Sequence, residues 1–263
     1  MVKEMDGEIK KVCRRIADDI RRTVLEKMET NHVSLGRNVG IGADGTPTEY
    51  IDKITEDVAV NHLKKSSVSL NLLSEEAGFI DYGGEYTLIL DPIDGTRNAV
   101  RGIPFYATSL AVGKNSLNSV EYGLVMNIPT GDVYVAEKGE GAYLNNQRIC
   151  TPQHVSGKTL SAIVLGESGD KRMKNLPYMD NVRSFGSASL EMCLVAQGAV
   201  DCFMCLKKHL RVTDITAATL IVREAHGVVV NREKEFLDMS CDVLERTSVV
   251  AAANNEVIAR LLG

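Results

Sequence analysis

The sequence predicts an α+β protein. Two segments near the N-terminus, residues 6–29 and 48–63, carry apolar residues at helical spacing. Four short apolar runs lie between residues 107 and 149, and glycine and asparagine turns separate them, which is typical of an antiparallel meander. Predicted strands and helices then alternate. A polar stretch at 151–154 divides the chain into an N-terminal half, 1–150, and a C-terminal half, 151–263.

Composition narrows the class of protein. A chain of 263 residues with 44% hydrophobic residues can bury a sizeable core. No apolar run approaches the ~20 residues of a membrane helix, the N-terminus is polar, and the six cysteines show no disulfide spacing. We therefore expect a cytoplasmic protein with reduced thiols and no membrane partner. The net charge of −5 argues against nucleic acid as a partner but allows an anionic substrate held through metal ions.

The N-terminal region predicts two helices joined by a loop. The first helix, residues 6–29, presents one apolar face, made of Ile9, Val12, Ile16, Ile20, Val24 and Met28. Residues 31–47 are rich in glycine, asparagine and aspartate and predict a loop. Its segment 40–45, which includes Asp44, is either a mobile active-site lid or a plain connector. Thr48 can cap the next helix, where Asp52 either complements the helix dipole or reaches a shared site.

The most informative stretch is Asp91-Pro92-Ile93-Asp94-Gly95-Thr96, which follows an apolar run at 86–90 that predicts a buried strand. Pro92 fixes one backbone φ between the two acids, and Gly95 lets a ligand approach the backbone closely. Exposed amides at Gly95 can cradle a phosphate. Two acids on a stiff turn before an anion cradle indicate a hard-metal phosphoryl site. The alternative is a turn that carries two solvated acids.

Other charged residues follow a predicted strand, follow the 91–96 stretch or open a predicted helix. Glu75 and Glu76 follow a predicted strand at 68–73, so one of them can point into a metal site, or both are solvated. Arg97 and Arg101 either face phosphate or lie on the surface. The other expected strands are 107–112, 121–126, 132–136, 142–149, 161–165, 200–204, 228–230 and 248–252; the other expected helices are 187–197, 213–225 and a final helix capped by Asn254. Asp214 opens one of these helices, and capping alone explains an aspartate there.

Four of these signals follow one another along the chain: Asp52, Glu75-Glu76, the 91–96 stretch, and the segment from Val212 to Ala225. Their order and spacing resemble the inositol monophosphatase and fructose-1,6-bisphosphatase superfamily. The Asp-Pro-Ile-Asp-Gly-Thr core is highly specific, and Gly186-Ser187-Ala188 matches a substrate-side turn of that family. The resemblance covers nearly the whole chain. It implies a layered αβαβα sugar-phosphatase fold, a homodimer, and Mg²⁺-dependent hydrolysis of small phosphate monoesters.

The resemblance also implies roles for individual residues. The metal ligands would be Glu75, Asp91, the Ile93 carbonyl, Asp94 and Asp214, which would hold two or three Mg²⁺ ions, with Mn²⁺ as a possible substitute. The catalytic residues would be Asp52, Thr96 and Glu75, with Asp52 and Thr96 orienting or deprotonating the attacking water. The substrate contacts would be Asp94, Gly95, Thr96, Arg183, Gly186, Ser187, Ala188, Lys207, Arg211 and Asp214, and Asp44 would lie on a mobile metal-binding loop. Clustered carboxylates independently fit Mg²⁺ better than zinc.

The chain also departs from the family pattern. Many members carry tryptophan where this chain has Thr213, and Gly-Gly where it has His226-Gly227. Inositol-selective members often place an acid shortly before the last metal aspartate, whereas residues 207–211 here are basic, which suits a second phosphate or a solvated charge run. The pattern is more similar to archaeal members that hydrolyse both inositol monophosphate and fructose 1,6-bisphosphate. We therefore expect hydrolysis of both; the alternatives are a 3′-phosphoadenosine 5′-phosphate phosphatase and a non-catalytic, RNA-associated regulatory member.

Overall fold

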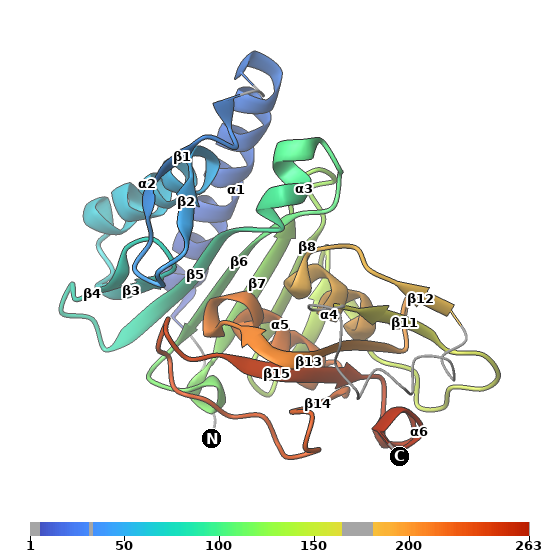
Figure 1. Cartoon of the computed structure of the whole chain (residues 1–263). Helices are drawn as coiled ribbons and strands as arrows, with labels where there is room; N and C mark the ends of the chain where they lie inside the picture. The colour runs from blue at the N-terminus through green and yellow to red at the C-terminus, as the bar shows by residue number, and fades with distance from the viewer. Residues whose placement is uncertain (1–5, 32–33, 165–180, 263) are drawn as a thin grey trace.

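The protein is built in five layers (Figure 1). A computed structural model describes residues 6–31, 34–164 and 181–262. Helices α1 (Gly7–Asn31) and α2 (Tyr50–Lys65) form the first layer, and an eight-stranded sheet forms the second. Helices α4 (Ala188–Ala196) and α5 (Val212–Glu224) separate it from a five-stranded sheet, and α6 (Asn255–Leu262) covers the far side of that sheet. The expected αβαβα layering is confirmed.

The larger sheet contains the predicted meander. Its strand order is β10-β9-β8-β7-β6-β5-β3-β4, and all neighbouring strands are antiparallel except β3 and β5. The expected run 142–149 is in fact two strands, because Asn145 and Asn146 both adopt a positive φ and turn the chain back. The strands are β3 (Leu70–Ser74), β4 (Gly78–Ile80), β5 (Tyr86–Asp94), β6 (Ala107–Gly113), β7 (Tyr122–Asn127), β8 (Val133–Glu137), β9 (Gly141–Leu144) and β10 (Gln147–Ile149).

The smaller sheet is mixed, with strand order β12-β11-β13-β15-β14. Strand β11 runs parallel to β12 and β13, whereas β15 is antiparallel to β13 and β14. Strand β13 extends well past the expected end at residue 204, because its pairing with β15 resumes at Leu210 after an irregularity. The expected end of β11 at Leu165 lies outside the described residues. The strands are β11 (Leu160–Ile163), β12 (Asn181–Arg183), β13 (Cys202–Leu210), β14 (Val228–Val230) and β15 (Thr247–Ala252).

Three apolar cores hold the layers together. One core packs the predicted face of α1 and α2 against the larger sheet, and another lies between α6 and the smaller sheet. The central core surrounds α4 and α5, and every residue of α5 from Val212 to Val222 is buried because sheets cover both of its sides. Helix α5 lies so close to β7 that a side chain on Gly123 would come within 3.0 Å of the Ala217 carbonyl oxygen. This packing fixes the start of α5, where Asp214 lies.

The segment before α2 differs from the expected loop. Strands β1 (Asn38–Ile41) and β2 (Pro47–Glu49) form an antiparallel hairpin, and Asp44 lies in its turn region. The cap of α2 is Glu49 rather than Thr48, since β2 extends to Glu49 and the Glu49 amide donates to Asp52 Oδ2 at 3.3 Å. The Thr48 hydroxyl instead donates to the Glu76 carboxylate. The predicted cap of α6 is confirmed, because Asn254 Oδ1 accepts the Val257 amide.

Two short helical segments complete the described chain, α3 (Thr96–Arg101) and a 3₁₀ turn at Leu117–Ser119. The cysteines at 202 and 205 are buried and have free thiols. Within residues 6–31, 34–164 and 181–262, every helix is too short or too polar to cross a lipid bilayer.

Candidate active site

The 91–96 stretch forms the end of β5, where the pairing with β6 is interrupted. Asp91 still faces Ser109 across the ladder, and the register then shifts before Asp94 pairs with Ala107. Pro92 lies within this irregularity, where its missing amide hydrogen leaves no ladder bond unmade. The Ile93 amide donates to Asp91 Oδ1 at 3.0 Å. The carboxylate of Asp91 is thereby fixed at the carboxyl end of a central, buried strand.

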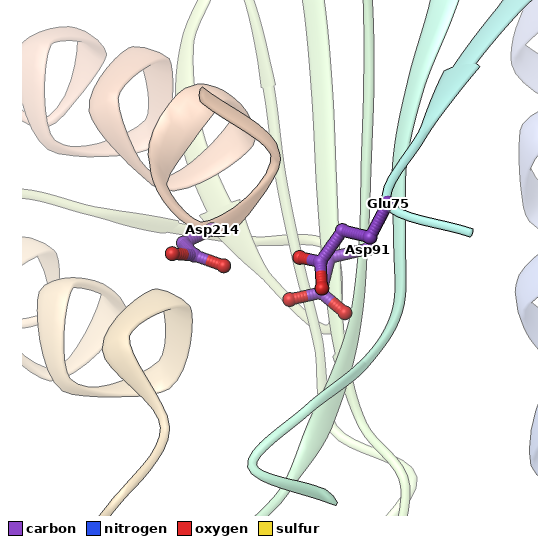
Figure 2. Close-up of side chains that lie close together, drawn as sticks. All are labelled: Glu75, Asp91 and Asp214. Atoms are coloured by element: carbon purple, nitrogen blue, oxygen red, sulfur yellow. The ribbon is translucent and has the colours of Figure 1, made fainter. Parts of the chain in front are cut away.

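Two further acids meet Asp91 from distant parts of the chain (Figure 2). Glu75 directly follows β3, the parallel neighbour of β5, so both strands deliver an acid to the same edge of the sheet. Asp214 lies in the first turn of α5. One carboxylate oxygen from each of the three residues lies within 4.8 Å of the others, and all three side chains are buried. A cluster with only carboxylate oxygens suits a hard divalent cation such as Mg²⁺.

Burial and neighbouring charges raise the pKa values of Glu75 and Asp91. Burial raises the pKa of Glu75 well above its usual value, and the charge of Asp91 raises it further. Burial likewise raises the pKa of Asp91, to which the charges of Asp94 and Asp214 add. Buried carboxylates at this separation need a positive partner to be ionised together. The cluster is therefore a strong candidate for cation binding.

Arg211 provides one such positive charge. Its guanidinium forms ion pairs with Glu75, with Asp44 at 2.9 Å and with Asp214 at 2.9 Å. The arginine thus joins the β1–β2 hairpin to the acid cluster, and Arg246 adds a longer contact to Asp44 at 3.4 Å. Burial acts to raise the pKa of Asp44, but hydrogen bonds from Thr46 and Arg211 outweigh it, so the pKa is lowered. Asp44 is held as an anion beside the cluster.

Asp94 is held by a different element. Its Oδ2 accepts the Ser187 hydroxyl and the Ser189 amide, both at 2.7 Å, and its Oδ1 accepts the Ala188 amide at 3.2 Å. These donors form the start of α4, so Asp94 ties the predicted substrate-side turn to the end of β5. The Ile93 carbonyl accepts the Thr96 hydroxyl at 2.9 Å. Metal ligation by Asp94 and by the Ile93 carbonyl stays a prediction.

Asp52 and Thr96 form a second polar pair beside the cluster. The Thr96 hydroxyl lies 3.1 Å from Asp52 Oδ1. Burial raises the pKa of Asp52 to about 7; the Thr96 hydrogen bond opposes this shift, and the charges of Glu76 and Glu49 reinforce it. A carboxylate with a pKa near neutrality can accept a proton at physiological pH.

The predicted phosphate cradle lies against the turn before α4. Gly95 has φ +97°, and a side chain there would come within 3.0 Å of the Gly186 carbonyl oxygen. Two polar residues anchor this turn. The side-chain amide of Asn98 donates to the Phe185 carbonyl at 2.6 Å, and Glu191 Oε1 accepts the backbone amides of Phe185 and Gly186. Both the αL conformation and the close approach therefore require glycine at position 95.

A cavity of about 660 Å³ opens over these groups. Its walls include most of the predicted site residues, and Arg97 and His209 add positive or titratable groups. Arg101, Arg183, Lys207 and Asp44 are not part of its lining. Sequence reasoning missed Glu49 and included His209 only as part of the basic run 207–211; the position of Glu49, three residues before Asp52 in a capping pattern, was a local signal for it. The lining residues predicted from sequence are Asp52, Glu75, Asp91, Ile93, Asp94, Gly95, Thr96, Gly186, Ser187, Ala188, Arg211 and Asp214.

Comparisons with known proteins agree with this geometry. Residues 7–263 match the sequence profile of the Inositol monophosphatase family. A fructose-1,6-bisphosphatase/inositol-1-monophosphatase of Methanothermobacter thermautotrophicus is 38% identical over 96% of this chain and 95% of the relative. A solved structure of an inositol monophosphatase-fructose 1,6 bisphosphatase superposes with a TM-score of 0.86 at 31% identity, covering 98% of this chain and 99% of that one.

One further relative is longer. A bifunctional NADP phosphatase/NAD kinase of Methanococcus maripaludis is 36% identical over 94% of this chain. The match covers 47% of that relative, so this chain spans about half of its length.

Proposed function

Because the chain belongs to the inositol monophosphatase family, it is a phosphoric monoester hydrolase, and we propose that it is a Mg²⁺-dependent phosphatase of small phosphorylated sugars and polyols. The observation that carries the proposal is the meeting of Glu75, Asp91 and Asp214 within 4.8 Å, beside the Asp52–Thr96 pair. We further propose two or three metal ions per site, with Mn²⁺ as a substitute, and a cytoplasmic homodimer.

The proposed mechanism divides the work between the cations and the chain. Glu75, Asp91 and Asp214 would hold Mg²⁺, and Asp94 and the Ile93 carbonyl are further candidate ligands. Mg²⁺ held by these residues would supply Lewis-acid activation of water and would neutralise charge on the leaving oxygen. Asp52 would accept the proton of the attacking water, which the Thr96 hydroxyl orients.

Substrate binding would follow from the same site. Amides at Gly95 and Thr96 would bind the reacting phosphate, and the start of α4 would face it from the other side. Positioning of the phosphate, rather than covalent chemistry, is then the main contribution of the chain.

Arg97 on the cavity wall favours substrates with a second anionic group, such as fructose 1,6-bisphosphate. Arg211 is already paired with three acids, and burial lowers the pKa of His209. The cavity of about 660 Å³ is large enough for a phosphorylated sugar. The names of the archaeal relatives, which include both fructose-1,6-bisphosphatase and inositol-1-monophosphatase, support this choice. Contacts from Arg183 and Lys207 to substrate stay a prediction.

NADP is a second candidate substrate, because two relatives at 36% and 35% identity are NADP phosphatases joined to NAD kinases. Its 2′-phosphate is a monoester on a ribose ring, chemically close to a sugar phosphate. Since the matched region is only about half of each relative, the whole protein's activity does not transfer directly.

Phosphate release tests the proposal. We would assay inositol 1-phosphate, fructose 1,6-bisphosphate, NADP and 3′-phosphoadenosine 5′-phosphate with Mg²⁺ and with EDTA, using Arg101→Ala as a matched surface control. We expect Mg²⁺-dependent turnover that is highest for the first two substrates. Absence of turnover on every substrate, or turnover insensitive to EDTA, would contradict the proposal. RNA binding without turnover would instead support the regulatory alternative.

A further inference from the structure

The side chain of Thr213 contacts the acid cluster from the first turn of α5. Its hydroxyl lies 2.9 Å from Glu75 Oε1, and both residues are buried, with 1% and 9% of their surfaces exposed. A carboxylate can only accept, so the threonine hydroxyl is the donor when Glu75 is ionised. This bond joins the end of β3 to the start of α5, two elements that are far apart in the sequence.

We propose that Thr213 is a positioning residue of the metal site, which holds the Glu75 carboxylate in the orientation that a divalent cation requires. The inference rests on the proposed metal-dependent function. Thr213 itself would touch neither metal nor substrate. It would act through Glu75 Oε1 and leave Oε2 turned toward the Arg211 guanidinium, which also holds Asp214.

Glu75 needs such a partner because of its side chain. The terminal torsion of glutamate is broad and roughly two-fold, so packing alone fixes the carboxylate plane poorly. Threonine, in contrast, is branched at Cβ, and within a helix its side chain is restricted mainly to two χ1 rotamers. A donor with few rotamers on the buried first turn of α5 therefore sets the orientation of a flexible acid, and groups that orient metal ligands in this way commonly affect metal affinity.

Two other threonines on α5 show that this arrangement is particular to Thr213. Thr216 and Thr219 are equally buried, with 1% exposure each. The Thr216 hydroxyl donates to the Val212 carbonyl within the helix, which is the usual local bond of a helical threonine. The Thr219 hydroxyl has no hydrogen-bond partner within the described part of the chain. Among these three hydroxyls, only that of Thr213 bonds to the acid cluster.

The test replaces each hydroxyl with a methyl group of nearly the same size. We would prepare Thr213→Val, Thr213→Ser, Thr216→Val and Thr219→Val and measure Mn²⁺ affinity by calorimetry, with thermal melting in EDTA to confirm folding. Thr213→Val should weaken Mn²⁺ binding by about 10- to 100-fold, the usual effect of losing a group that orients a metal ligand. Thr213→Ser keeps the hydroxyl and should bind Mn²⁺ with the affinity of the original chain. The variants at 216 and 219 should also bind Mn²⁺ with that affinity.

The outcomes distinguish the positioning role of Thr213 from the proposed metal-dependent function. If the original chain binds Mn²⁺ and Thr213→Val binds it with unchanged affinity, the positioning role of Thr213 is overturned, and the proposed function is not. Equal weakening in the variants at 216 and 219 also overturns it, because the effect would then reflect packing of α5. If the original chain binds no Mn²⁺, the proposed function fails as well. Should Thr213→Val not fold, Thr213→Ala compared with Thr213→Ser decides the question by the same criterion.

Discussion

Replacing Asp91 with asparagine should stabilise the metal-free protein while lowering its turnover by about 100-fold or more. The ligand oxygens of Glu75, Asp91 and Asp214 lie within 4.8 Å of one another. Two like charges at that separation repel by about 3.5 kcal/mol at an effective dielectric constant of 20. The Arg211 guanidinium offsets part of this repulsion. We therefore expect Asp91→Asn to raise the free energy of unfolding in EDTA by about 1–2 kcal/mol, a fraction of the bare Coulomb energy.

The size of this gain should depend on pH. Burial raises the pKa of Asp91 in the folded protein above its unfolded value of about 4. The folded form thus binds the proton more tightly, so the contribution of Asp91 to stability is fully present below about pH 4 and is lost as the pH rises through the folded pKa. Asparagine does not ionise. The advantage of the variant in EDTA should therefore increase with rising pH.

Thermal melting and steady-state assays measure the two effects. For a protein of this size, each kcal/mol shifts the melting temperature by about 2–4 °C, so the variant should melt about 2–8 °C higher in EDTA. Mg²⁺ should stabilise the original protein and not the variant, and kcat should fall by about 100-fold or more. A lower melting temperature in EDTA at alkaline pH, or retained turnover, would refute the reasoning.

Three further changes test other parts of the site and fold. Asp52→Asn should lower kcat by about 100-fold. Because burial raises the pKa of Asp52 to about 7 and only the ionised carboxylate can act as the base, kcat of the original enzyme should rise with pH up to about 7, and the variant should lose this dependence. An unchanged pH–rate profile in the variant would exclude Asp52 as the base. Arg97→Ala should lower kcat/KM for fructose 1,6-bisphosphate about tenfold and affect inositol 1-phosphate less, whereas Arg101→Ala should change neither; equal losses on both substrates would contradict a second-phosphate contact. His226→Gly should raise the free energy of unfolding by about 1 kcal/mol, because His226 follows the end of α5 with φ 69°, a left-handed conformation that strains residues with a side chain. A lower stability of the variant in urea melts would show that the His226 side chain contributes more stability than this strain costs.

Local sequence patterns were sufficient for the elements whose signals are local. The helical stripe of α1, the apolar run of β5 and the meander all follow from spacing of residue types, and the structure confirms each of them. The acids at 75, 91 and 214 were also identified as candidates, because each lies at or next to the end of such an element. Resemblance to a family then indicated that they converge, which spacing alone does not show.

Long-range pairing determined the features that sequence missed. The β1–β2 hairpin lacks an apolar alternation, and backbone bonds to distant residues hold it: the amides of Ala43 and Asp44 donate to the carbonyls of Glu76 and Glu75. Strand β13 passes through Lys207 and Lys208, whose charges hide its continuation, and only its pairing with β15 reveals it. These contacts join segments far apart in the chain, so no local pattern reports them.

The placement of Arg211 illustrates the same limit for side chains. Sequence suggested a basic cluster at 207–211, yet only the folded arrangement brings this guanidinium between Glu75, Asp44 and Asp214. Which charges a long, flexible side chain contacts depends on the positions of acids from other elements.

Anomalous scattering from crystals grown with Mn²⁺ tests the central claim most directly. We predict a Mn²⁺ peak about 2 Å from carboxylate oxygens of Glu75, Asp91 and Asp214, the bond length expected for a small hard cation. The absence of a peak at these three carboxylates, with Mn²⁺ bound elsewhere or not at all, would contradict it.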